Sequence, residues 1–171
     1  MTNTFSKRTL CGAIMTRAAV AVAVLLGLAS PAFAQARALE GVWAVATQDR
    51  NCATNAPQGS PTRALVTYHA DGTVSESRHI PVFATGQLSE SHGIWNHDGR
   101  GNYQGRVVTM INFASAAGTT PSFQAGWMLA TQTIALVGPN AFTMTGSTDF
   151  YNLDLQVYRV GCATRVAERL R

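Results

Sequence analysis

Four histidines are the residues of this chain best suited to bind a metal ion, but their spacing argues against a shared site. His92 and His97 are five residues apart, so they have opposite parity on a strand and meet only if the turn after Asn96 bends sharply. His69 and His79 fall on opposite faces of one predicted hairpin. The sequence contains no H-x-H or H-E-x-x-H motif. We therefore predict no metal ion, and a structural or surface role for each histidine.

The carboxylates are no better placed for acid–base chemistry. Asp149 and Asp154 flank a predicted turn, where such side chains cap the backbone and stay solvated. Glu76 and Arg78 are two residues apart on one predicted strand, and we interpret them as a surface ion pair that contributes little to stability. The motifs G-x-S-x-G, G-x-G-x-x-G and the P-loop do not occur in the sequence. We therefore expect no catalytic residue and no cofactor.

The first 34 residues are typical of a cleaved export signal. Lys7, Arg8 and Arg17 supply positive charge, residues 18–28 form an apolar run, and Ala-Phe-Ala at 32–34 is a cleavage site. The apolar run is shorter than the roughly 20 residues that a membrane-spanning helix needs. The sequence therefore predicts cleavage after the last of these alanines, no membrane span, and a periplasmic or secreted protein.

Cleavage there would leave one domain, residues 35–171. The signal contains three of the 13 basic residues and none of the nine acids, so most of the net charge of +4 is lost with it. The remaining arginines are scattered along the chain, which argues against a nucleic-acid partner. Cys11 is also removed, which leaves Cys52 and Cys162 as a predicted disulfide in an oxidising compartment.

The rest of the sequence predicts an all-β domain with little helix. Runs of β-branched and aromatic residues alternate with turn residues, which is the pattern of antiparallel strands. The strands are expected at 41–47, 63–69, 73–78, 92–96, 103–113, 124–137, 141–150 and 154–160. Two long connections are expected at 48–62 and 79–91, and a short helical turn at 163–171. Eight strands in up-and-down order predict a single antiparallel β-barrel, whose interior is filled by side chains or holds one small ligand.

For one predicted hairpin, the sequence does not show which face is buried. Asp71-Gly72 is a strong signal for a two-residue turn. With that turn, the residues that share one face are Leu65, Thr67, His69, Val74, Glu76 and Arg78. Neither face of this hairpin is cleanly apolar, so the sequence does not decide which one points inward.

The predicted disulfide conflicts with the predicted strand ends. In an eight-stranded up-and-down barrel, the first and eighth strands end at opposite rims, yet Cys52 follows the first and Cys162 follows the last. We keep the disulfide and question the strand count.

The start of the first strand resembles that of a known group of barrels. Gly41-Val42-Trp43, the sequential hairpins, the eight strands and a late arginine, Arg159 or Arg165, resemble the calycin and lipocalin pattern. The chain also looks like a group of uncharacterised secreted bacterial proteins with a lipocalin-like domain. In lipocalins a tryptophan of the first strand closes one end of the barrel and a late arginine packs across it. The resemblance implies this barrel-closing role for Gly41, Trp43 and Arg165.

The resemblance also implies that the barrel binds a small apolar or amphipathic molecule. Ligand pockets are mostly apolar and aromatic, and we therefore expect the candidate lining residues to be Tyr68, Trp95, Tyr103 and Trp127. Because Trp43 is expected to close one end, the ligand is expected at the opposite rim. Two other functions stay open. One is a protein-binding module such as a periplasmic protease inhibitor, and the other is a barrel cyclase or hydrolase without a recognisable motif.

Overall fold

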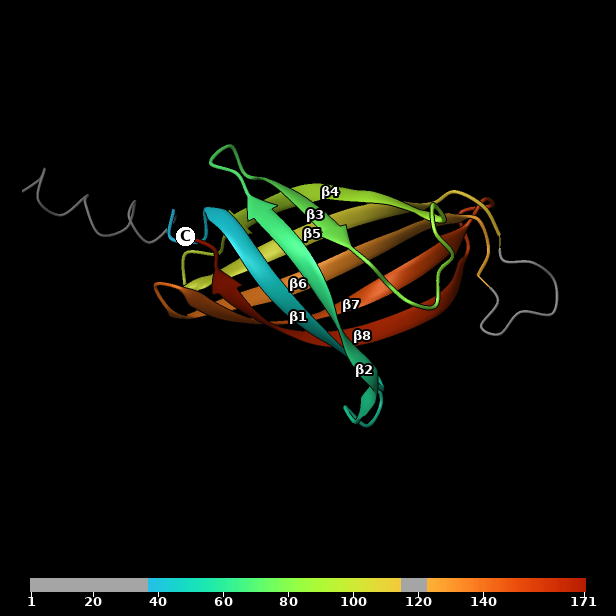
Figure 1. Cartoon of the computed structure of the whole chain (residues 1–171), viewed down its shortest axis with the longest axis horizontal. Coiled ribbons are helices and arrows are strands. Elements are labelled where there is room, and N and C mark those ends of the chain that lie inside the picture. The colour runs from blue at the N-terminus through green and yellow to red at the C-terminus, as the bar shows by residue number, and fades with distance from the viewer. Residues whose placement is uncertain (1–36, 115–122) are drawn as a thin grey trace, which may run out of the picture. The chain divides into compact units, whose positions relative to one another are not determined.

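The structure is a computed structural model that describes residues 37–114 and 123–171, and the predicted export signal lies outside these residues. The described chain forms eight strands: β1 (Gly41–Arg50), β2 (Pro57–Tyr68), β3 (Thr73–Arg78), β4 (Leu88–His97), β5 (Asn102–Ile111), β6 (Gly126–Gly138), β7 (Ala141–Asn152) and β8 (Val157–Arg169). Each strand pairs with its sequence neighbours, and β1 also pairs with β8, so the sheet closes into an antiparallel up-and-down barrel (Figure 1). The predicted fold class is confirmed.

Strand alternation determines which side chains enter the barrel. On β5 the buried residues alternate with more exposed ones, so that Tyr103, Val107 and Ile111 point inward. The same alternation is seen over most of β1, β4 and β6. Within the described residues there is no helix long and apolar enough to cross a membrane.

The turn between β2 and β3 is one residue longer than predicted. The amide of His69 donates to the carbonyl of Thr73, and the amide of Gly72 donates back to the carbonyl of His69. Residues 70–72 thus form a three-residue turn with Gly72 at a φ of +84°. Tyr68 consequently pairs with Val74, whereas the predicted two-residue turn would pair it with Ser75. This shift turns one face of the hairpin into the barrel, which buries Ala64, Val66, Tyr68, Val74 and Glu76.

Strands β1, β2 and β8 extend well beyond their predicted ends. The expected loop 48–62 shrinks to residues 51–56, because β1 continues to Arg50 and β2 begins at Pro57. The expected helical turn at 163–171 is wrong, since this segment continues β8 to Arg169. Both the strand count and the disulfide therefore hold, because Cys162 lies inside β8 and pairs with Arg50 at the end of β1.

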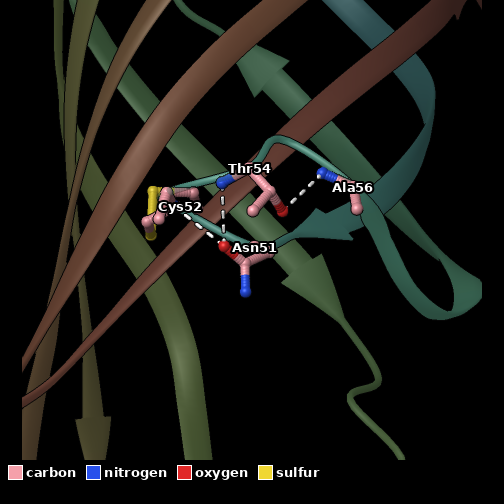
Figure 2. Close-up of a disulfide and its surroundings, with 6 residues drawn as sticks. Asn51, Cys52, Thr54 and Ala56 are labelled. Atoms are coloured by element: carbon pink, nitrogen blue, oxygen red, sulfur yellow. Dashed lines mark hydrogen bonds between the residues drawn. A yellow bond between two sulfur atoms is a disulfide. The ribbon is translucent and has the colours of Figure 1, made fainter.

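The turn after β1 places Cys52 against β8. The side-chain oxygen of Asn51 accepts hydrogen bonds from the amides of Ala53 and Thr54, at 2.9 Å each (Figure 2). Asn55 has a φ of +58°, a conformation that asparagine tolerates better than most residues. This turn directs Cys52 towards Cys162, and the two Cα atoms of the disulfide lie 5.2 Å apart.

Trp43 closes the end of the barrel at which β1 begins and β8 ends, called here the closed end. Its indole is fully buried and donates a hydrogen bond of 2.9 Å to the carbonyl of Leu39. The guanidinium of Arg169 lies over the indole ring, 4.1 Å from its centre, and donates to carbonyls of the segment before β1. Gly41 leaves room for this guanidinium, because a Cβ there would lie 2.7 Å from it.

The arginine that covers Trp43 is therefore not the expected one. The resemblance implied Arg165, but the register of β1 against β8 pairs Trp43 with Arg169 and pairs Arg165 with Thr47. Because β8 runs on to residue 169, the later arginine reaches the closed end. Arg165 instead lies in the middle of the barrel, where it is 7% exposed.

The interior has two apolar clusters with polar side chains between them. The closed-end cluster consists of Leu39, Trp43, Val45, Ala64, Val66, Tyr68, Val74, Trp95, Tyr103, Val107, Ala130, Ile134, Phe142, Met144 and Ala167. The open-end cluster consists of Phe83, Ile111, Phe123, Met128 and Phe150. The buried polar residues of the strands, called here the polar belt, are Thr47, Glu76, Ser91, Thr109, Gln132 and Arg165. Along β5, for example, Thr109 separates Val107 of one cluster from Ile111 of the other.

Removing the disulfide is expected to destabilise the barrel substantially. The bond joins residues 110 positions apart, and closing a loop of that length reduces the entropy of the unfolded chain by an amount equivalent to about 4 to 5 kcal/mol. We predict that Cys52→Ala with Cys162→Ala, or a reducing agent, lowers the free energy of unfolding by up to this amount in urea titrations. Cys11→Ser is the control and should leave it unchanged. Equal stability with and without reductant would contradict the prediction.

Candidate functional site

A cavity of about 620 Å³ lies at the end opposite Trp43, called here the open end. Its wall comes from the end of β1 and the following turn, the first half of β2, the end of β3 and the β3–β4 connection, the segment that enters β6 with the start of β6, and parts of β7 and β8. Cavities that bind small molecules typically measure about 300 to 1,000 Å³. The disulfide Cys52–Cys162 forms part of the wall.

The apolar part of the wall depends on the connection between β3 and β4. The side chain of Gln87 accepts a hydrogen bond from the amide of Ala84 and donates one to the carbonyl of Phe113, both at 2.9 Å. These bonds hold the connection across the open end and bury Phe83 there, where its ring stacks on Phe123 with ring centres 4.0 Å apart. The large apolar side chains that line the cavity are Ile80, Val82, Phe83, Phe123, Met128, Phe150 and Val160.

The polar belt contributes a charged cluster at the inner side of the cavity. Arg165 of β8 donates to a carboxylate oxygen of Glu76 on β3 at 2.8 Å, across the interior of the barrel. Arg78 lies on the other side of the same carboxylate, with its Nε atom 3.5 Å from the second oxygen. The side chains of Glu76, Arg165 and Arg78 are 2%, 6% and 14% exposed, respectively. The predicted surface pair Glu76–Arg78 is therefore buried, because the longer hairpin turn brings that face inside.

Burial and neighbouring charge act in opposite directions on these groups. Burial alone would raise the pKa of the Glu76 carboxyl, but the guanidinium groups of Arg165 and Arg78 hold that pKa below its ordinary value. For Arg78, burial lowers the pKa and the charge of Arg165 lowers it further, against the opposing effect of Glu76 and Asp49. The two guanidinium groups thus favour the ionised form of Glu76, and one carboxylate faces two guanidinium groups.

Two further arginines lie at the mouth of the cavity. The guanidinium of Arg159 lies over the rings of Phe123 and Phe150, at 5.0 and 4.9 Å from their centres. The Nε atom of Arg50 donates to the hydroxyl of Thr164 at 3.1 Å. Among the described residues that line the cavity, Asp49 is the one carboxylic acid, against four arginines.

The expected ligand-binding residues lie elsewhere in the structure. Tyr68, Trp95 and Tyr103 belong to the closed-end cluster, where Trp95 packs edge to face against Tyr68 and lies 5.8 Å from Tyr103 between ring centres. Trp127 alternates with inward-facing neighbours on β6, and its ring stacks on Tyr151 of β7 at 5.4 Å. None of the four is part of the cavity wall. Three fill the barrel and the fourth packs along its wall.

The histidines and aspartates that could have formed a site are dispersed. His69 contacts Ser75 at 3.3 Å, and the ring of His97 packs against Tyr103. In the part of the chain that the structure describes, no group of three or more His, Cys, Asp or Glu side chains is arranged to hold a metal ion. The turn that Asp149 and Asp154 were expected to cap is held instead by the side chain of Asn152.

The chain was compared with models of known protein families, with curated proteins and with solved structures, and none of the three comparisons gave a match.

Removing the charge of Glu76 is expected to destabilise the barrel. Glu76→Gln leaves two buried guanidinium groups without a carboxylate, and breaking a buried ion pair in this way typically costs about 3 to 5 kcal/mol. Urea unfolding followed by tryptophan fluorescence measures this loss. Glu90→Gln is the matched control, because Glu90 is exposed and on the neighbouring strand. Equal losses in the two variants would show that the buried cluster contributes nothing.

The same pair predicts a dependence of stability on pH. Because the pKa of Glu76 in the folded chain lies below the ordinary value of 4.5, the unfolded chain binds a proton first as the pH falls. The stabilisation that ionised Glu76 provides is therefore fully present above its pKa in the unfolded chain. It is lost as the pH falls through its lower pKa in the folded chain. Unfolding free energies measured at falling pH should converge for the wild type and Glu76→Gln. A constant difference between them would contradict the prediction.

Proposed function

We propose that this protein is a secreted lipocalin-like barrel that binds a small amphipathic molecule in its open-end cavity. The observation that carries the proposal is the cavity itself, about 620 Å³ in size, in a barrel whose other half is packed with side chains. Side chains of both kinds that an amphipathic molecule needs line it, since phenylalanine rings and guanidinium groups are both part of its wall.

The division of the barrel supports a ligand at the open end. At the closed end the interior is occupied by buried rings, and Phe142 packs against both Trp43 and Tyr68. At the open end, Phe83, Phe123 and Phe150 stand along one side of a cavity that is large enough for a molecule of drug-like size.

Export is part of the same proposal. The disulfide is consistent with an oxidising extracellular compartment, where such bonds form and persist. The sequence of residues 1–34 has the charge pattern, apolar run and small-residue cleavage site of an export signal. We therefore place the folded barrel in the periplasm or outside the cell.

The two alternatives have less support. A protein-binding module would use projecting segments, and the β1–β2 hairpin does carry exposed residues from Cys52 to Pro61. It is fixed to β8 by the disulfide, however, and forms a wall of the cavity. A barrel enzyme would need groups that transfer protons, whereas the side chains that converge at the cavity are mainly guanidinium groups, which retain their protons and bind anions.

Filling the cavity is expected to weaken ligand binding strongly without unfolding the barrel. Ala163 of β8 lines the cavity, and Ala163→Phe would place a ring inside it. We predict that the uncharged fluorophore anilinonaphthalene binds the wild type saturably, with one site per chain, and that Ala163→Phe weakens this binding by about tenfold or more.

Val166→Phe is the matched control, because Val166 lies on the same strand with its side chain exposed. It should bind the fluorophore as the wild type does. Native mass spectrometry of protein purified from its host should also detect a bound small molecule. A wild type that neither enhances the fluorescence nor carries a bound molecule would overturn the proposed function.

A further inference from the structure

The interior of the barrel contains one more positive charge than negative charge. Arg78 and Arg165 are both buried around Glu76, and the described polar belt contains no other ionisable side chain. Burying a charge is unfavourable unless an opposite charge and hydrogen bonds compensate it. One carboxylate compensates one guanidinium, so one unit of positive charge is left over inside the barrel.

The geometry assigns this surplus to Arg78. Arg165 is held close to Glu76, with a donor–acceptor distance of 2.8 Å. Arg78 is held loosely, because its Nε atom lies 3.5 Å from the carboxylate and has no hydrogen-bond partner. Arg78 also lines the cavity, so it can offer hydrogen-bond donors to a molecule there.

The charged side chains at the mouth of the cavity also favour a negatively charged ligand. Arg50 and Arg159 stand there against a single carboxylate, that of Asp49, which gives the entrance a net positive charge. Charges of one sign around a cavity raise the local concentration of the opposite ion. Arg159 is held over Phe123 and Phe150, so positive charge and apolar surface are adjacent at the point of entry.

We propose that the cavity selects amphipathic molecules that carry a single oxyanion, such as a carboxylate or a sulfonate, and that Arg78 binds this group. The inference rests on the proposed function and specifies the ligand class of the same site. The apolar part of the ligand lies against Phe83, Phe123 and Met128. One negative charge balances the surplus at Arg78.

The test uses two fluorophores that differ by one charge, anilinonaphthalene and its sulfonate. The wild type should bind the sulfonate about tenfold to a hundredfold more tightly, which is the range expected for a hydrogen-bonded charge pair. In Arg78→Met this preference should disappear because the sulfonate loses affinity, while the uncharged fluorophore keeps its affinity. Arg78→Met retains the Glu76–Arg165 pair and so leaves a neutral cluster.

Arg106→Met is the matched control, since it removes the same charge from an exposed, outward-facing position of β5. It should keep the preference for the sulfonate. Thermal unfolding checks that the variants fold, and Arg78→Gln replaces Arg78→Met if the latter does not. The comparison of the two fluorophores on the wild type requires no variant.

The outcomes separate this inference from the proposed function. Equal binding of both fluorophores to the wild type would overturn the inference and leave the ligand-binding function standing. A preference for the sulfonate that survives in Arg78→Met would overturn the assignment to Arg78. If the wild type binds neither fluorophore, both the proposed function and the inference fail.

Discussion

The ion pair between Glu76 on β3 and Arg165 on β8 divides the interior of this barrel into two parts with different properties. It spans the lumen, because its two strands lie on opposite sides of β1 and β2 in the closed sheet. Towards Trp43 the interior is a packed set of aromatic and aliphatic side chains, and towards the disulfide it opens into the cavity. A buried ion pair seldom stabilises a protein more than apolar residues of the same size would. The Glu76–Arg165 pair instead determines the arrangement of the interior. It marks the boundary between the packed closed end and the cavity, and it places the guanidinium of Arg78 beside the cavity.

Much of the fold follows from the sequence, because it depends on patterns that repeat over many residues. Strand alternation, the hairpin order and the number of strands are each supported by many positions, and the pairing of Cys52 with Cys162 follows from the count of cysteines once the predicted export signal is set aside. The errors fall at strand ends. Residues 48–50 contain no β-branched or aromatic residue and residues 163–169 contain only Thr164 and Val166, and both segments are strands because β1 and β8 pair with each other to close the barrel. Closure is a property of the whole sheet, so no local pattern predicts it. The same cause explains why Arg169, rather than Arg165, covers Trp43.

The candidate site was missed for two physical reasons. The first is a single residue in the β2–β3 turn. A two-residue turn puts Leu65 and Thr67 on the face of Glu76, whereas the observed three-residue turn puts Val66 and Tyr68 there, and a shift of one residue moves every side chain to the other face. A comparison of the two faces could have found this, because Ala64, Val66, Tyr68 and Val74 are the more apolar set.

The second reason is that an aromatic residue has the same sequence signature whether it fills a barrel or lines a cavity. Only the three-dimensional packing separates Tyr103, which fills, from Phe83, which lines.

The two ends of the barrel are stabilised by different means, and the difference follows from the cavity. At the closed end, the indole of Trp43 is packed on all sides and Arg169 ties the strand ends to the segment before β1, so tight packing and hydrogen bonds suffice. A wall that faces a cavity lacks packing partners on one side and loses the dispersion energy that they would supply. The covalent bond between Cys52 and Cys162 lies in that wall. It acts mainly on the unfolded chain, so it stabilises the folded barrel without filling the open end. A disulfide in this position is therefore compatible with a cavity that remains open, whereas additional core side chains would occupy the space that a ligand needs.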